Sequence, residues 1–401
     1  MRARTAALLS LAGAATAIAG MSARGGLAAR RGLETATGEA GHRIGIMGRI
    51  DLGETMVDGQ TVKTRVVYRH LASRFGADAI RTVDTLDYRH HPLRVAKDAA
   101  RCLAVCDDVV VLLSDNGRRF FFPVLALAAS TRGTRVFHNL IGGRLADDIE
   151  RDPSGRLVRY LNSFQVNWVE SRALVARLAE LGVRNAAYLP NFKDLDPLAA
   201  RLEAPEDRPA RLCVFSRVVP GKGIENAVRA VAALNEAAGT DGAVASLDIY
   251  GPVDEAYEEE FRALIEAVPH ARYMGSVKPE KGVETIRDYS ALLFPTEFWG
   301  EGIPGTIVDA MGAGLPVIAS HWAYYSEMLA DGVTGLGYDF ERPEELWPTI
   351  EAFLALPREE VEAMRRAIHE RAEAYTADAV FERIAEALTA QGLASRILLQ
   401  I

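Results

Sequence analysis

Residues 291–319 read ALLFPTEFWGEGIPGTIVDAMGAGLPVIA, and the interpretation of the fold depends on this stretch. The apolar run at 291–294 predicts a buried strand, and a turn rich in Gly and Pro follows it. A helix is expected to begin at about Thr306 and to end at Gly314, before a second buried strand at 316–319. Strand, helix and strand in this order predict a βαβ unit of a parallel sheet.

The same alternation continues in both directions along the chain. In the first half the helical patterns are at 59–75 and 92–105, and in the second at 224–237 and 257–267. Further strand candidates are 43–47, 108–113, 134–137, 163–168, 186–189, 211–215, 246–250, 271–274 and 335–338. The sequence therefore predicts an α/β protein with two Rossmann-like, doubly wound parallel-sheet domains.

A segment rich in Pro, Glu, Arg and Asp at 195–209 is interpreted as the linker between the two halves. This places an N-terminal domain at 42–196 and a C-terminal domain at 197–377, with a helix at about 378–401 that packs back on the first domain. Residues 1–41 are rich in Ala, Gly and Arg after a basic start. They are interpreted as a translated upstream extension, a weak secretory signal or an amphipathic tail, with an extension or disordered tail favoured.

Composition and charge exclude several classes of protein. The 401 residues carry a net charge of −8, which gives no general attraction to nucleic acid. The three cysteines are too few for a disulfide framework, and no histidine cluster completes a metal site with Cys102 and Cys106. They are expected to be buried thiols. No segment after the N-terminal run is a candidate for crossing a membrane.

A basic loop follows the strand predicted at 211–215. Arg217, Lys222 and two glycines, Gly221 and Gly223, lie between this strand and the next helix. Free N–H groups at a helix N-terminus attract anions, and Arg and Lys add full positive charges that could neutralise a diphosphate. The alternative is a polar turn with two solvated bases. The spacing does not fit a Walker loop.

The turn after the strand at 291–294 carries two carboxylates, Glu301 and Asp309. They could accept hydrogen bonds from hydroxyl groups, while Gly302 and Gly305 let backbone N–H groups approach a ligand. A structural alternative exists for Asp309, because Thr306-Ile-Val-Asp309 fits a capping box in which Asp309 reaches back to the N-cap backbone.

Taken together, these motifs resemble glycosyltransferase family 4, the retaining GT-B glycosyltransferases. The resemblance covers roughly residues 185–340 and follows the family's order of motifs. These are Arg217…Lys222-Gly223, Tyr250-Gly251-Pro252, Tyr273-Met274-Gly275, Pro295-Thr296, the E-x7-E-like element from Glu301 to Asp309, and Gly314-Leu-Pro-Val-Ile-Ala319.

The resemblance implies a role for each matching residue. Arg217 and Lys222 would hold the donor diphosphate, and Glu301 would lie beside the donor sugar. Asp309 would bind the ribose hydroxyls, although it replaces the family's Glu and is shorter by one carbon, roughly 1.5 Å. The donor is also expected to contact a set of loop residues, largely through their backbone: Gly223, Gly251, Gly302, Ile303, Pro304, Gly305, Thr306 and Ile307.

The N-terminal half resembles the family more loosely. His138, after the strand candidate at 134–137, resembles the family's histidine near the donor sugar, although a structural role is equally open. Gly53 lies in a loop that resembles the family's first Gly-rich loop, which approaches donor and acceptor, although its glycines could equally serve only as turn residues. The helix pattern at 60–75 carries Lys63, Arg65, Arg69 and Arg74, which would touch a membrane surface or form a solvated face.

The resemblance implies transfer of a sugar from a nucleoside-diphosphate sugar, UDP- or GDP-linked, to a hydroxyl acceptor with retention of configuration. No metal or other cofactor is required. The acceptor would be a glycan, a lipid-linked molecule or a small molecule, in polysaccharide or glycoconjugate synthesis. The protein is expected in the cytoplasm, with contact to the inner face of the membrane left open. Alternatives are an epimerase or a glycan phosphorylase on the same fold, and a non-catalytic sugar-nucleotide-binding protein.

Overall fold

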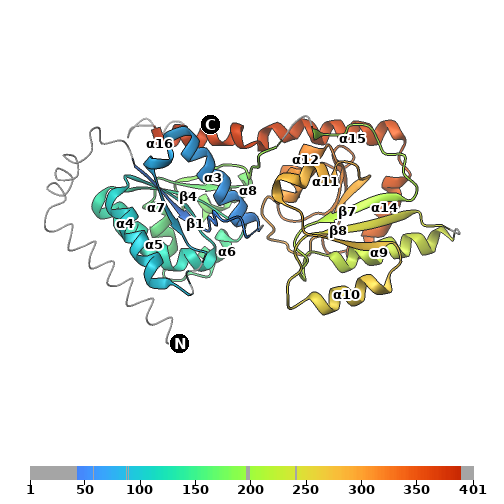
Figure 1. Ribbon diagram of the computed structural model, residues 1–401, viewed down its shortest axis with the longest axis horizontal. Coiled ribbons are helices and arrows are strands. Elements are labelled where there is room, and N and C mark those ends of the chain that lie inside the picture. Colours follow the sequence, from blue (N-terminus) through green and yellow to red (C-terminus); the bar gives the residue numbers. More distant parts are fainter. Residues whose placement is uncertain are drawn as a thin grey trace. The chain divides into compact units, whose positions relative to one another are not determined.

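A computed structural model describes residues 43–389 apart from residues 57, 87, 89, 196–198 and 240–241. The expected N-terminal extension and the end of the expected C-terminal helix lie outside these residues. The described chain divides into two compact units (Figure 1). Of the described residues, unit 1 contains those from 43 to 189 and from 381 to 389, and unit 2 is Pro190–Val380. The division falls a few residues before the boundary expected at 196.

Unit 1 contains a parallel six-stranded sheet in the order β2-β1-β3-β4-β5-β6. Helices follow most of its strands, as in a doubly wound fold. The elements are β1 (Ile44–Gly48), α3 (Gly59–Phe75), β2 (Ile80–Asp84), α4 (Pro92–Val105), β3 (Asp108–Leu112), α5 (Asp115–Arg132), β4 (Arg135–Asn139), α6 (Leu145–Glu150), α7 (Arg156–Asn162), β5 (Val166–Val169), α8 (Arg172–Glu180) and β6 (Ala186–Tyr188). Helix α16 (Ala377–Thr389) reaches unit 1, where the ring of Phe381 packs against His70 at 5.1 Å between centroids.

Unit 2 contains the second parallel sheet, in the order β12-β11-β10-β7-β8-β9. Its elements are β7 (Ala210–Phe215), α9 (Ile224–Ala238), β8 (Ala245–Tyr250), α10 (Glu258–Ala267), β9 (Ala271–Gly275), α11 (Gly282–Ile286), β10 (Ala291–Phe294), α12 (Gly305–Ala313), β11 (Val317–Ser320), α13 (Tyr325–Met328), β12 (Gly335–Tyr338), α14 (Leu346–Leu354) and α15 (Arg358–Glu370). The prediction of an α/β protein with two doubly wound parallel sheets is confirmed.

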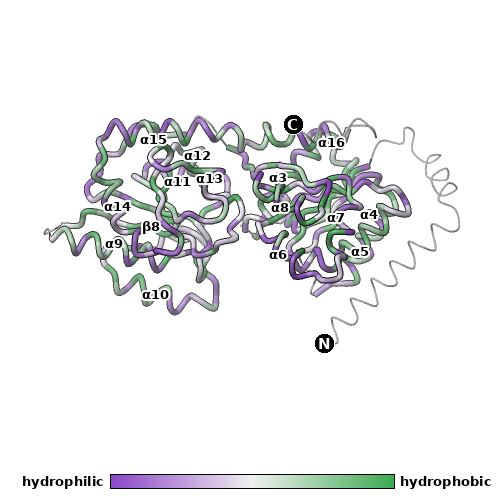
Figure 2. The backbone as a smooth tube through the Cα atoms, turned by 180° about the vertical axis from the view of Figure 1, so that it is seen from behind, coloured by the Kyte–Doolittle hydropathy of each residue, from purple (hydrophilic) through white to green (hydrophobic). Residues whose placement is uncertain are grey.

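Both faces of the unit 2 sheet are covered by helices, which explains why its central strands β10 and β11 are apolar at nearly every position. Leu293 of β10 packs into the core beside α9 and α14, while its neighbours Leu292 and Phe294 pack into the core beside α11 and α12. Figure 1 shows α9 and α10 on one side of this sheet and α11 and α12 on the other. In Figure 2 the tube of α15 alternates between hydrophilic and hydrophobic segments, as expected of a helix with one buried face.

One strand of unit 1 was absent from the sequence-based prediction. Strand β2 lies at the edge of the sheet and pairs only with β1. Its residues Ile80 and Val83 are buried, whereas Arg81 and Thr82 are exposed. An edge strand with two core residues lacks the apolar run that identified the central strands.

The segment predicted to be a linker packs on unit 2 instead. The Arg201 N–H donates to the Ala313 carbonyl (3.1 Å), and Ala204 belongs to the core of unit 2. The fully buried Arg365 of α15 donates through Nε to the Arg201 carbonyl (2.9 Å). Polar composition was misleading here, because these residues bury their backbone and one small side chain rather than large apolar groups.

Candidate functional site

The carboxyl edge of the unit 2 sheet brings the two predicted motifs together. The chain passes from β7 to β8 and β9 on one side and later returns to the other side of β7 at β10. In open α/β sheets, ligands bind outside the carboxyl ends of the strands at such a switch point. The loop after β7 carries Arg217 and Lys222, and the loop after β10 carries Glu301. These loops therefore line the position where a ligand is expected.

Two glycines allow these loops to lie in direct contact. Gly223 has φ +68°, and a Cβ there would overlap the carbonyl oxygen of Pro295 in the loop after β10. Gly251, after β8, has φ +135°, and a Cβ there would overlap the carbonyl of Ser216. Positive φ together with the absence of space excludes any other residue without movement of the backbone. Both glycines thus bring the loops together, whether or not they also contact a ligand.

Lys222 and Glu301 form an ion pair across the two loops. Their side chains are 19% and 18% exposed, so the pair is partly shielded from water but accessible. The Thr296 hydroxyl lies 3.4 Å from the same carboxylate oxygen, and the Glu297 N–H donates to the Gly221 carbonyl at 3.0 Å. Arg217, in the same loop as Lys222, is exposed. The edge therefore carries two basic groups and a carboxylate that is already oriented.

The chain after Glu301 leads into the N-terminus of α12. The side chains of Ile303 and Ile307 are buried in the core of unit 2, so a ligand could meet only their backbone. Helix α12 begins at Gly305, after Pro304, and its first N–H groups have no partner within the helix. The Thr306 hydroxyl is buried without a hydrogen-bond partner. The N-terminus of α12 is therefore suited to an anion or to the hydroxyl groups of a ligand.

The proposed capping box at Thr306 is wrong. Pro304 is the N-cap residue, and no side chain caps the helix. The helix begins one residue before Thr306, so that Thr306 is no longer at the N-cap position that the motif requires.

Asp309 instead pairs with Lys193, a residue that the sequence interpretation did not select. Asp309 is 1% exposed, and burial raises the pKa of its carboxyl group, although Lys193 opposes this shift. The Lys193 side chain passes beside Gly305, and Asn191 Nδ2 donates to the Ile303 carbonyl at 2.9 Å. Both residues follow β6. The sequence signal that could have indicated Asn191 and Lys193 is the occurrence of two polar residues, one of them basic, shortly after a predicted strand.

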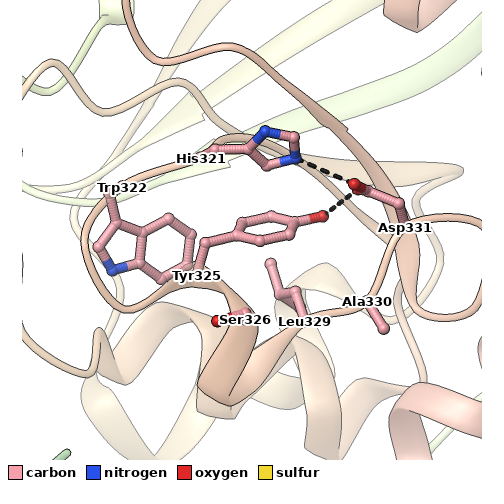
Figure 3. A pocket seen from close by; sticks show the side chains of 7 residues that line it. All are labelled: His321, Trp322, Tyr325, Ser326, Leu329, Ala330 and Asp331. Atoms are coloured by element: carbon pink, nitrogen blue, oxygen red, sulfur yellow. Dashed lines mark hydrogen bonds and ion pairs between the residues drawn. The ribbon is translucent and has the colours of Figure 1, made fainter. Parts of the chain in front are cut away.

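A pocket of about 460 Å³ lies on the adjoining segment after β11 (Figure 3). Asp331 accepts a hydrogen bond from the Tyr325 hydroxyl (2.5 Å) and lies 3.0 Å from His321 Nε2. Figure 3 shows these groups turned toward one another, so they satisfy each other's hydrogen bonds. The indole of Trp322, in the wall of the pocket, donates to the Gly302 carbonyl at 3.3 Å. We interpret this cluster as a support for the Glu301 loop.

In unit 1, Gly53 lies in an exposed loop after β1, and this loop is held by Asp51 and Asp84. Asp51 Oδ2 accepts the Met56 N–H (2.6 Å), while Asp84 accepts the Asp51 N–H (2.9 Å). A Cβ on Gly53 would meet nothing closer than 3.7 Å. Gly53 is therefore not required by close packing.

His138 is fully buried in β4. Asn167 donates its amide hydrogens to the Leu161 carbonyl and to Asn185 Oδ1, so its own oxygen accepts from His138 Nδ1–H at 3.1 Å. His138 Nε2 is then a lone-pair acceptor, and it has no partner. Burial, together with the charge of Arg118, lowers the pKa of His138 to about 3. A ligand could reach this nitrogen only if neighbouring side chains moved.

The basic residues of α3 do not form one exposed face, which corrects the expected membrane-facing or solvated surface. Lys63 is buried and pairs with Glu170 at 2.5 Å, and Arg65 is buried and pairs with Asp51 at 3.3 Å. Only Arg69 and Arg74 lie at the surface. The buried pairs neutralise half of the charge expected on this helix.

Within the described parts of residues 43–389, no three His, Cys, Asp or Glu residues are grouped so that they could hold a metal ion. No helix in the same residues is both long and apolar enough to cross a membrane. Cys102, Cys106 and Cys213 are buried free thiols, as predicted.

Residues 199–374, a little under half of the chain, match the family model of glycosyl transferases group 1. No curated protein sequence matches the chain. The matched residues lie in unit 2 and include Lys222, Glu301 and Asp309.

Solved structures extend the similarity to most of the chain. A complex of Alr3699/HepE from Anabaena with UDP and glucose superposes with a TM-score of 0.64 and 12% identity, covering 87% of this chain and 100% of the other. The apo form of the lipopolysaccharide outer core galactosyltransferase WaaB gives 0.60 and 16%, covering 86% and 99%. A UDP-forming α,α-trehalose-phosphate synthase from Burkholderia xenovorans, with glucose 6-phosphate, gives 0.62 and 14%, covering 87% and 100%. The chain therefore has the GT-B fold of glycosyltransferases.

Proposed function

We propose that the protein is a retaining glycosyltransferase of the family 4 type, which moves a sugar from a nucleoside-diphosphate sugar to a hydroxyl group. The observation that carries the proposal is the pairing of Lys222 with Glu301 at the switch point of unit 2, beside the N-terminus of α12. The GT-B fold and the match of residues 199–374 support it.

In the proposed reaction the bond between the anomeric carbon and the diphosphate breaks while the acceptor oxygen bonds to that carbon. Negative charge develops on the departing diphosphate, and preorganised positive groups stabilise it. Arg217, Lys222 and the first N–H groups of α12 would supply this stabilisation, so that no metal is assigned to it. The acceptor proton passes to a departing phosphate oxygen, and Glu301 positions the sugar hydroxyls.

We propose UDP as the nucleotide part of the donor, because several structural neighbours are complexes with UDP. The ribose role of Asp309 needs one further step, since Lys193 covers its carboxylate. A ribose hydroxyl would either displace the Lys193 ammonium or bind it. We further propose a role in polysaccharide or glycoconjugate synthesis in the cytoplasm, supported by the fold shared with a lipopolysaccharide galactosyltransferase.

Product analysis tests the function. The protein is incubated with UDP-glucose, UDP-galactose or UDP-N-acetylglucosamine and a panel of glycosides, and the products are followed by proton NMR. We expect UDP release that depends on an acceptor, and a glycoside with the α configuration of the donor. A β product would contradict retention, a new sugar nucleotide formed without acceptor would indicate an epimerase, and UDP binding without turnover would indicate a non-catalytic protein.

A further inference from the structure

Two large aromatic side chains are exposed next to the candidate donor site. Phe298 and Trp299 are 46% and 58% exposed, and they lie between Glu297 and Glu301 in the loop after β10. Exposed aromatic pairs of this size are uncommon away from binding surfaces, because their contact with water is unfavourable. Neither residue has a role in the proposed donor chemistry.

The loop that carries the pair is held on both sides. The Phe298 N–H donates to the Thr296 hydroxyl (3.2 Å), and the Phe298 carbonyl accepts the Glu301 N–H (3.0 Å). The Trp299 carbonyl accepts the Ala323 N–H at 3.1 Å. The Trp299 ring packs edge-on against Phe340 with centroids 5.2 Å apart. Because the loop is already held in place, the binding of a ligand to these rings would cost little conformational entropy of the loop.

The charges around the pair restrict the ligand. Glu297 and Glu301 flank the two aromatic residues, and Glu301 is neutralised by Lys222. Burial, and the neighbouring Glu225, raise the pKa of Glu297. Carboxylates disfavour an anionic lipid surface, but they accept hydrogen bonds from hydroxyl groups. A sugar ring fits both features, since it has an apolar face of C–H groups and a rim of hydroxyls.

We propose that Phe298 and Trp299 form a stacking platform for a sugar ring of the acceptor, so that the acceptor is a glycoside or glycan. This inference rests on the proposed function, because it assigns the acceptor side of the same reaction. The aromatic rings would contact the apolar face of the sugar, and Glu297 would accept hydrogen bonds from its rim.

Tryptophan fluorescence gives a direct measurement. Of the four tryptophans, Trp168 and Trp322 are buried and Trp347 is partly buried, which leaves Trp299 as the strongly exposed one. With UDP present, the glycoside that most accelerates UDP release by the wild type is titrated while acrylamide quenching is recorded. We expect saturable protection of the exposed tryptophan. The protection should vanish in Trp299→Phe, which keeps an aromatic face and therefore most of the acceptor activity.

Kinetics of variants provide the second test. In Phe298→Ala/Trp299→Ala we expect kcat/KM for the glycoside to fall at least tenfold, mainly through KM for the acceptor, and by much more than the affinity for UDP. Val333→Ala removes another exposed apolar side chain of unit 2 and serves as the matched control. It should behave as the wild type. The single variant Trp299→Ala is used if the double variant does not fold.

The outcomes separate the two proposals. If the wild type neither binds UDP nor turns over a UDP-sugar, the proposed function itself fails. If it turns over the donor but no glycoside accelerates UDP release, or if the variants keep the wild-type acceptor KM, the platform is overturned alone. Protection of Trp299 by phosphatidylglycerol vesicles, with no effect of glycosides, would replace the sugar ring with a lipid surface.

Discussion

At the residue scale, the surroundings of His138 in unit 1 favour the neutral form of its imidazole. Its Nδ1–H is donated to Asn167, its ring packs edge-on against Phe122 at 5.0 Å, and its pKa is lowered to about 3. The imidazole is therefore neutral at physiological pH and offers one acceptor nitrogen. If it contacts the donor sugar, it can only accept a hydrogen bond from a hydroxyl, and it cannot act as a general acid.

This state has a consequence for stability as a function of pH. In the unfolded chain the pKa of His138 is near 6.5, so the unfolded state binds a proton below this pH and the folded state does not until about pH 3. The stability contributed by His138 is thus present above pH 6.5 and is lost as pH falls from 6.5 toward 3, by up to about 1.4 kcal/mol per pH unit. Urea unfolding of the wild type and of His138→Gln at several pH values should show this loss in the wild type alone.

NMR of the folded protein gives an independent check. The His138 ring resonances, assigned by comparison with His138→Gln, should not titrate between pH 5 and 8. Titration of these resonances near pH 6.5 would show that the imidazole is accessible and charged, and would return it to consideration as a proton donor.

At the scale of elements, the central strands could be predicted because their physical signal is local. Strands β7 and β10 are buried on both faces, so nearly every residue is apolar and the run is visible without any tertiary information. Strand β2 and the packed segment near Arg201 lacked this signal, because only part of each is buried. The rule for switch points placed the loops of Lys222 and Glu301 at one edge of the sheet, since each loop could be assigned to the end of a strand, but the ion pair between the two side chains was not predicted.

The pairing of Lys193 with Asp309 could not be predicted in the same way. The two residues are 116 positions apart, and nothing in the sequence shows that the segment after β6 lies beside the first turns of α12. The backbone of Lys193 also bonds to Tyr375 and Ala377 (3.1 and 2.8 Å). Lys193 lies in the segment that follows β6. Its side chain contacts Asp309 of α12, and its backbone bonds to the segment 375–377, near the point where the chain returns to unit 1.

We predict that Lys193→Met destabilises unit 2 by about 3 kcal/mol, because it leaves the carboxylate of Asp309 buried without a countercharge. Lys193→Met/Asp309→Asn should recover most of this loss. The deficit of the single variant should shrink as pH falls, because protonation of Asp309 removes the buried charge. Burial raises the pKa of this carboxyl group in the folded state, so the destabilisation is complete above the folded pKa and is lost as pH falls from there toward the unfolded pKa. Denaturant unfolding of the four proteins of this double-mutant cycle measures the coupling.

Lys281→Met is the matched control for this cycle, because Lys281 is exposed and forms an ion pair with Glu284 within one helical turn. Its effect on the free energy of unfolding should be much smaller than that of Lys193→Met, because water screens an exposed ion pair. An equally small effect of Lys193→Met, or additivity in the cycle, would show that the pair does not support α12.

At the scale of the whole molecule, the chain has two parallel sheets of the same type, and each has its own switch point. The sequence predicted this organisation, because two sets of alternating strands and helices are separated by one polar segment. The sequence indicated candidate residues for the donor side of the proposed reaction more readily than for the acceptor side. A diphosphate requires positive charge and helix N-termini at a defined sheet edge, whereas acceptor contacts come from loops whose shape depends on the whole fold.

The central claim is that the carboxyl edge of the unit 2 sheet binds the nucleoside diphosphate of the donor. Isothermal titration calorimetry with UDP tests it most directly, using the wild type, Arg217→Ala/Lys222→Ala, and Arg262→Ala. Arg262 is an exposed arginine of α10 in an ion pair with Glu258, so it controls for loss of charge in the same unit. We predict one UDP per chain in the wild type and in Arg262→Ala. The affinity should fall at least thirtyfold in the double variant, since about 2 kcal/mol of charge-assisted hydrogen bonding to phosphate is lost. The absence of UDP binding by the folded wild type, or equal affinity in all three proteins, would contradict the account.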